Sequence, residues 1–219
     1  MTDKILDIIN ASFPLMEKDA GEFAKAKVSV MTFESKCYEA QGLGNVCVMT
    51  GTAMMGLMKM VTVVLNPFDR DMPLMSYDRI YAMGNDTLLL EVYETRLDKF
   101  VSFNSLEEMQ KRLSNVPDKK LEQRWYDSLS LIPAVAKIGK KKNSAEFDKF
   151  TADYITEFIS KAVSAPVCDR AEKKKAASVY TEGLLNNGGS STDQFIKAKG
   201  KDYTQRFFRE VFFGTGTPD

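Results

Sequence analysis

The carboxylate of Asp78 is the side chain whose position in this sequence most suggests chemistry. Residues in a β-strand alternate between two faces, so in a strand over 76–83 Asp78 shares a face with the apolar Ile80 and Ala82. Burial on such a face disfavours the charged form and raises the pKa of a carboxyl group, which makes it a proton donor near neutral pH. The alternative is a structural ion pair with a nearby Arg or Lys, and the spacing leaves both open.

The chain contains no histidine, which removes several classes of site. A Ser-His-Asp or Cys-His nucleophile, a His-ligated zinc or haem, and an imidazole acid or base are all excluded. The three cysteines are widely spaced without a CxxC pair, so neither a metal site nor a disulfide framework is expected: Cys37, Cys47 and Cys168. We expect free thiols in a reducing cytoplasm.

Methionines concentrate in the middle of the chain, where 8 of the 12 lie between residues 49 and 83. Flexible, polarisable methionines either fill a core or form a surface that adapts to a large, flat apolar ligand. Both interpretations stay open. The eight are Met49, Met54, Met55, Met58, Met60, Met72, Met75 and Met83.

Basic residues are in excess in the C-terminal half, although the whole chain has 30 Lys and Arg against 30 Asp and Glu. Residues 133–201 contain 13 Lys and Arg against 8 Asp and Glu, an excess of 13 − 8 = 5. Solvated helix faces explain this most simply, and a docking patch for an acidic protein is the sharper interpretation. Nucleic acid is not expected as a partner, because no aromatic residues are interleaved with these lysines.

The length of 219 residues, with 44% hydrophobic residues, predicts a single domain over 1–219. The N-terminus has no apolar stretch of signal-peptide type, and no stretch approaches the roughly 18 apolar residues needed to span a bilayer. We therefore expect a cytoplasmic protein that does not associate with membranes. A monomer is the default expectation.

Strand patterns dominate residues 27–95, and helical patterns dominate the two ends. Five β-rich runs, at 27–40, 45–54, 57–66, 76–83 and 86–95, are separated by short turns, which favours an antiparallel meander. Gly84-Asn85 predicts a hairpin with a type II′ turn. Ser105 and Glu108 have capping-box spacing, and Asp169 can begin a later helix. The expected fold is α+β, an α/β/α sandwich with a central antiparallel sheet of five to six strands.

Two segments resemble the ferredoxin-dependent bilin reductases, as a divergent member would. The first is a strand that ends in Asn66-Pro67, followed by Met72-Pro73-Leu74-Met75 and by Asp78 on the next strand. The second is the C-terminal stretch STDQFIKAKGKDYTQRFFREVFFG, a helix, a glycine and an aromatic helix. The resemblance covers about residues 58–97 and 184–214, and elsewhere only the order of elements.

This resemblance implies an α/β/α sandwich that binds a linear tetrapyrrole, or bilin, between the sheet and the C-terminal helices. It implies electrons from ferredoxin in single steps, with no bound flavin, nicotinamide or metal. Asp78 matches the proton-donating Asp of the family. Matching backward without gaps places Val61 where one member has a catalytic His and Met49 near its catalytic Glu, so the regiochemistry cannot be carried over.

A further acidic residue, found in some members just before the C-terminal helix, is replaced here by Asn186-Asn187-Gly188. Asn187 is therefore expected to hydrogen-bond a ligand and not to donate a proton. The leading hypothesis is a bilin-reductase-like oxidoreductase with Asp78 as proton donor. The second is a non-catalytic protein of the same fold that binds a tetrapyrrole or another flat ligand, and the third is an interaction protein without a small-molecule site.

Overall fold

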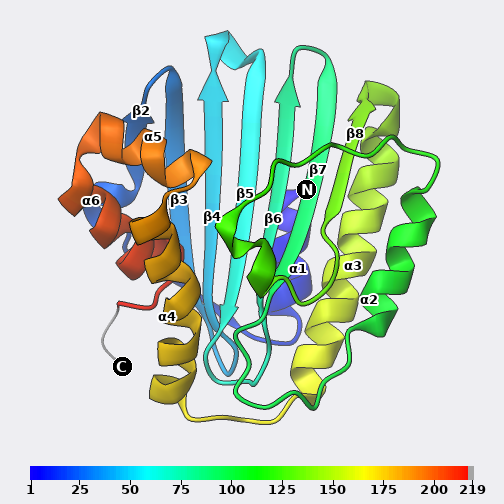
Figure 1. The fold of residues 1–219 in the computed structure, drawn as a ribbon, viewed down its shortest axis with the longest axis vertical. Coiled ribbons are helices and arrows are strands. Elements are labelled where there is room, and N and C mark those ends of the chain that lie inside the picture. The colour runs from blue at the N-terminus through cyan, green and yellow to red at the C-terminus, as the bar shows by residue number, and fades with distance from the viewer. Residues whose placement is uncertain (217–219) are drawn as a thin grey trace.

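An eight-stranded antiparallel sheet forms the centre of the computed structural model, which describes residues 1–216 apart from the side chain of Ser190 (Figure 1). The strand order is β1-β3-β4-β5-β6-β7-β8, and β2 also pairs with β3. The strands are β1 (Leu15–Lys18), β2 (Lys25–Val28), β3 (Met31–Ala40), β4 (Gly44–Ala53), β5 (Met58–Pro67), β6 (Leu74–Ala82), β7 (Asn85–Tyr93) and β8 (Val135–Lys140).

Helices lie on both sides of this sheet, so the expected α/β/α sandwich with an antiparallel sheet is confirmed. In Figure 1, α4 to α6 lie over β2 to β4 on the viewer's side, and α1 lies behind the strands. The helices are α1 (Thr2–Asn10), α2 (Asn104–Met109), α3 (Ser144–Ser164), α4 (Arg170–Asn187), α5 (Ser190–Lys199) and α6 (Lys201–Arg206), which continues into a π-helical turn (Phe207–Phe212). No helix among the described residues is both long and apolar enough to cross a membrane.

Two hydrophobic clusters separate the two faces of the sheet. Val63 and Tyr77 pack into the cluster that contains α1, α2 and α3, and we call this side the α3 face. Val64 and Leu74 lie at odd-numbered spacings from Val63 and Tyr77 on the same strands, so their side chains point to the other face. They pack into the cluster that contains α4, α5 and the aromatic C-terminal segment, and we call this side the α4 face. The period-two alternation of the strands therefore decides which side chains can meet the C-terminal helices.

The sheet has more strands than the five to six expected. The run 27–40 is divided into β2 and β3 by a turn in which Ser29 adopts a left-handed φ of 54°. This turn has no Gly, Asn or Pro to reveal it. The other additional strands, β1 and β8, are short edge strands of 4 and 6 residues, whose charged side chains obscured the strand pattern.

The two predicted helix starts have different outcomes. The Asp169 carboxylate accepts a hydrogen bond from the Glu172 amide at 2.8 Å, so the predicted start of α4 is confirmed. The capping box at Ser105 is wrong, because Phe103 occupies the N-cap position of α2. Ser105 Oγ instead donates to Glu157 of α3 at 2.6 Å, a contact between helices that local spacing could not reveal.

The hairpin between β6 and β7 forms, but its turn lies one residue earlier than the predicted Gly84-Asn85 and is of a different type. Met83 and Gly84 are the two central residues, with φ values of 51° and 73°. Positive φ at both positions defines a type I′ turn, so the predicted type II′ turn is wrong. Because Met83 has a Cβ, it occupies the left-handed region at an energetic cost, while its side chain is almost fully exposed.

Replacing Met83 by Asn is expected to raise the free energy of unfolding by about 1 kcal/mol, because Asn tolerates a left-handed backbone better. Urea unfolding would measure the change. Val30→Asn is the matched control, since Val30 is also an exposed apolar turn residue but has no positive φ. Equal stabilisation by both substitutions would show that removal of exposed apolar surface, and not backbone strain, is responsible.

Candidate functional site

Asp78 lies in the middle of the sheet, on the α4 face. Its cross-strand neighbours are Thr62 on β5 and Leu89 on β7. Ile80 shares this face, as the strand alternation predicts, and lies opposite the half-buried Met60. One row of side chains thus crosses the sheet beneath the C-terminal helices, in the order Ser35, Met49, Thr62, Asp78, Leu89 and Ala136.

The carboxylate of Asp78 is half-buried and is held by two hydroxyl groups. Thr62 Oγ1 donates to Oδ1 in a short hydrogen bond, and Ser76 Oγ lies 3.5 Å from Oδ2. The pKa of Asp78 is raised to about 6, mainly by burial; the Glu91 carboxylate contributes to the rise, while both hydroxyl groups and the Arg124 guanidinium oppose it. A carboxyl group with this pKa is present in both protonation states near neutral pH, as a proton donor requires.

A second carboxylate, which the sequence analysis missed, lies beside Asp78 on the same face. Glu91 is the buried cross-strand partner of Ser76, two residues from Asp78 along β6. Its Oε1 accepts a hydrogen bond from Arg124 Nη2 at 2.6 Å. The sequence does contain a signal for it: Glu91 is an acidic residue in the largely apolar run 86–95, and it lies on the same strand face as Leu89.

Arg124 belongs to a short segment that crosses the α4 face, formed by residues 124–129 and called here the strap (Figure 1). Trp125 fixes the strap to α4, because its Nε1 donates to the Gly188 carbonyl at 3.0 Å. Its ring packs so closely on Gly183 that a Cβ there would lie 2.1 Å from the ring. The strap therefore brings a cation from outside the sheet to the acidic pair.

Aromatic rings close the side of the site next to the strap. Tyr180 of α4 stacks on Tyr93 of β7 with ring centroids 4.4 Å apart, and Tyr126 of the strap packs edge-on against Tyr93 at 5.8 Å. Burial raises the pKa of Tyr180 well above its usual value, and the nearby charges of Glu91 and Asp78 add to the effect. The phenol therefore stays protonated beside the two carboxylates.

The opposite side of the site is only partly covered. Side chains on the α4 face above Asp78 are half-buried, and farther along the same strands the hairpin tips are exposed. The half-buried set is Met58, Met60, Ile80, Leu89 and Ile138, and the exposed tips are Met54, Met55, Leu57 and Met83. The apolar face thus remains accessible from the hairpin end.

Some of the central methionines therefore fill the core, and others lie on the accessible apolar face. Met49, Met72 and Met75 are buried in the core. Met58 and Met60 line the accessible strip beside Asp78. Only this second group has the placement expected of a surface that adapts to a flat ligand.

Three positions where the resemblance led us to look for further functional groups are spread over the molecule: Val61, Met49 and Asn187. Val61 packs with the cluster on the α3 face, so the residue opposite Asp78 on its own face is Thr62. Met49 lies next to Thr62 in the same row and is buried. Asn187 is exposed at the C-terminal end of α4, and its contact with a ligand stays a prediction.

Part of the basic excess lies inside the protein. Lys173 is completely buried and donates to the Thr95 carbonyl at 2.8 Å, and burial lowers its pKa to about 8. Lys137 is nearly buried and pairs with Asp118 at 2.6 Å. Neither the solvated-face nor the docking interpretation applies to these two lysines. Among the described residues, no three Cys, Asp or Glu side chains are grouped so that they could hold a metal ion.

The raised pKa of Asp78 predicts a pH-dependent effect on stability. Since the folded-state pKa of about 6 exceeds the ordinary value of 3.8, folding favours the protonated form, and this contribution is lost as the pH rises through about 6. Asp78→Asn is therefore expected to gain about 1–3 kcal/mol relative to the parent at pH 8, and much less at pH 4. Urea unfolding at both pH values measures this. The exposed control Asp98→Asn should show no such difference.

The architecture is that of the bilin reductases, with one antiparallel sheet between two helical layers. A crystal structure of phytochromobilin synthase from tomato, in complex with biliverdin, matches the chain with a TM-score of 0.76. The match covers 98% of this chain and 82% of the synthase at 12% sequence identity, so it shows a shared fold. No protein-family model matches the sequence, and neither does any curated protein.

Proposed function

We propose that this protein reduces a linear tetrapyrrole with electrons from ferredoxin, and that Asp78 donates a proton to the pigment. The observation that carries the proposal is the Asp78 carboxyl group, with a pKa of about 6, on a half-open apolar face between the sheet and the C-terminal helices. The fold is shared with a synthase whose structure contains biliverdin, which supports a ligand of this class.

The α4 face suits a flat, apolar ligand. Met60, Ile80 and Leu89 surround Asp78 and are half-buried, so a planar pigment would bury apolar surface there without unfolding the C-terminal helices. Methionine can adjust to the irregular outline of an open-chain pigment. The strap and its aromatic wall would then limit how far the pigment slides toward Glu91.

Proton transfer matters because each electron adds negative charge to the pigment. Two electrons from ferredoxin and two protons together saturate one double bond, and Asp78 would supply a proton at the site of added charge. The carboxylate left behind would accept hydrogen bonds from Thr62 and Ser76, which stabilise it. Water reaching the half-open side would return the proton to Asp78 before the next transfer.

The electron donor would dock on exposed lysines of the C-terminal helices. Lys197, Lys199 and Lys201 are exposed on α5 and at the start of α6, which lie on the same side of the sheet as Asp78. An acidic ferredoxin would be attracted to them, and salt would weaken this attraction. The buried Lys173 is not part of this patch.

Two steps test the proposal. Biliverdin mixed with the purified protein should shift its visible absorption, and reduced ferredoxin should then convert the bound pigment. Ile80→Arg should prevent the shift, because a cationic side chain would occupy the apolar face, while Val30→Arg at an exposed turn should not. Absence of any shift with the parent protein would remove tetrapyrroles from consideration.

A non-catalytic bilin-binding protein is the second candidate. The observation in its favour is that Glu91 is neutralised by Arg124, while Val61 and Met49 carry no proton to donate. Asp78 would then be the one acid of the site with no cationic partner bonded to it. A shift in the biliverdin spectrum without turnover by reduced ferredoxin would favour this candidate over the reductase.

A further inference from the structure

Two free thiols face each other on neighbouring strands below the candidate site. Cys37 of β3 and Cys47 of β4 are direct cross-strand partners, and both point to the α4 face. Cys37 is 2% exposed and Cys47 is 0% exposed. Burial raises the pKa of Cys47 well above its usual value, and the nearby Cys37 adds to this effect, as expected of sulfur atoms close to one another.

The directions of the backbone groups of β3 show whether Cys37 and Cys47 form a hydrogen-bonded or a non-hydrogen-bonded pair. The amide of Ser35 donates to the Ala24 carbonyl, away from β4, at 2.9 Å. Because the backbone groups of a strand alternate sides, those of Cys37 also point away from β4, toward its partner Lys18 on β1. Cys37 and Cys47 are therefore a non-hydrogen-bonded pair, in which Cα atoms lie about 4.5 Å apart.

This spacing is compatible with a disulfide, which requires Cα atoms about 4.4–6.8 Å apart. In non-hydrogen-bonded pairs the Cβ atoms also approach most closely, at about 4.5 Å. A bond between the two sulfur atoms therefore needs a rotation of side chains and no change of strand register.

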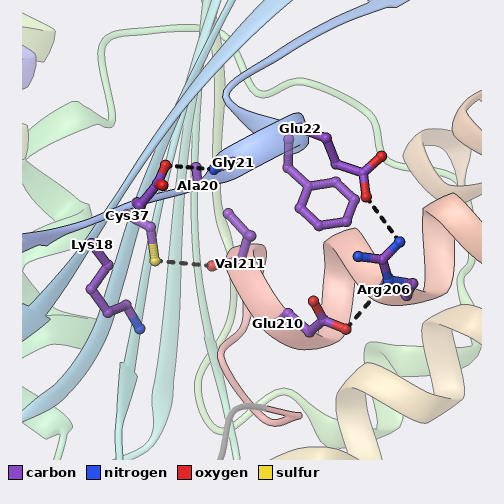
Figure 2. A pocket seen from close by; sticks show the side chains of 10 residues that line it. Lys18, Ala20, Gly21, Glu22, Cys37, Arg206, Glu210 and Val211 are labelled. Atoms are coloured by element: carbon purple, nitrogen blue, oxygen red, sulfur yellow. Dashed lines mark hydrogen bonds and ion pairs between the residues drawn. The ribbon is translucent and has the colours of Figure 1, made fainter.

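A pocket of about 430 Å³ gives a small molecule access to Cys37 (Figure 2). Lys18 and the residue pair Arg206 and Glu210 line it, and Cys37 lies at its inner wall. Cys47 does not line the pocket, so the two thiols differ in accessibility. An oxidant entering from solvent would meet Cys37 first.

We propose that Cys37 and Cys47 are a site of reversible oxidation, at which a peroxide forms a cross-strand disulfide. Cys37 loses its proton and its sulfur attacks one peroxide oxygen; the O–O bond breaks, and the leaving hydroxide takes up that proton and departs as water, which gives a sulfenic acid. Cys47 then loses its proton and attacks this sulfur; the S–O bond breaks, and the leaving hydroxide takes up the proton and departs as a second water. Two thiols are oxidised to one disulfide while one peroxide is reduced to two waters.

Oxidation would also act on the C-terminal segment. In the reduced protein Cys37 Sγ donates to the Val211 carbonyl at 3.3 Å and lies 3.2 Å from Asn45 Oδ1. Rotation of this sulfur toward Cys47 removes its contact with Val211, which belongs to the π-helical turn that packs on the α4 face. Burial raises the pKa of both thiols and Lys18 partly opposes this, so we expect the reaction to be slow.

The test uses Cys168→Ser, which retains only the two thiols of interest. After treatment with hydrogen peroxide, denaturation and alkylation, this protein should accept no alkyl groups and remain a monomer, and dithiothreitol should restore both sites. Proteolysis after Glu39 places Cys37 and Cys47 on different peptides. The disulfide should hold these two peptides together until it is reduced. Cys47→Ala in the same background should instead stop at oxidised Cys37, which cannot close the bond.

Three results would overturn the proposal. The first is two alkyl groups on the treated Cys168→Ser protein. The second is two cysteines oxidised separately to sulfinic acids, and the third is a disulfide between two chains. Because this variant keeps both buried thiols and replaces only a half-buried one, circular dichroism before treatment should match that of the parent.

Discussion

Asp78→Asn is expected to lower the rate of tetrapyrrole reduction by about 10²–10⁴-fold, the usual contribution of a positioned acid. Pigment binding should change little, because an amide of the same shape can still accept the hydrogen bond from Thr62. Single-turnover absorbance measurements with reduced ferredoxin give the rate, and a titration with biliverdin gives the affinity.

The pH profile separates this role from a structural one. In the parent protein the rate should fall as the pH rises above about 6, where the folded Asp78 loses its proton. The residual rate of Asp78→Asn should not show this step. Asp98→Asn, at an exposed position, should keep both the rate and the profile of the parent. Full turnover by Asp78→Asn would disprove the proton-donor assignment.

The second large effect is expected on the opposite face, where Arg79 is 2% exposed. Its Nη2 lies 2.6 Å from Asp86 Oδ2, and Asp86 also accepts a hydrogen bond from Ser144 of α3 at 2.6 Å. Arg79→Met would leave the buried Asp86 carboxylate without its cation. We expect a loss of about 3–5 kcal/mol in the free energy of unfolding, measured in urea at pH 7.

The double variant Arg79→Met, Asp86→Leu should recover much of this loss, because it removes both charges together. Glu34→Gln is the control for an exposed pair: Glu34 lies 2.9 Å from Lys25, and its loss should cost less than about 1 kcal/mol. A loss below 1 kcal/mol for Arg79→Met would mean that water or another cation compensates Asp86.

The sequence allowed the layered fold to be predicted, because the β-rich runs of β4 to β7, the short turns between them and the helical patterns at both ends are strong local signals. Elements defined by distant contacts were missed. Lys137 interrupts the apolar pattern of the edge strand β8, and its charge is neutralised by Asp118, nineteen residues away in the sequence. Likewise, Ser105 bonds to another helix and not to its own N-terminus.

The same division applies to the site. Asp78 could be found because a lone acid on an apolar strand face is a local anomaly. Its electrostatic surroundings could not, since Arg124 lies 33 residues from Glu91 on a segment without regular strand or helix periodicity. The position of the strap depends on Trp125 and Gly183, a contact that only the folded chain creates.

Both edges of the sheet are built so that they offer little to another polypeptide. At one edge, β1 and β2 are each four residues long and pair with different parts of β3, and Lys25 and Lys27 of β2 are exposed there. At the other, residues 117–119 bond to the backbone of Ala136 and Ile138 along the outside of β8. Interrupted, lysine-bearing or occupied edges oppose the strand-by-strand stacking that leads to fibres. Association of this protein through the edges of its sheet is therefore disfavoured, whatever molecule binds to its apolar face.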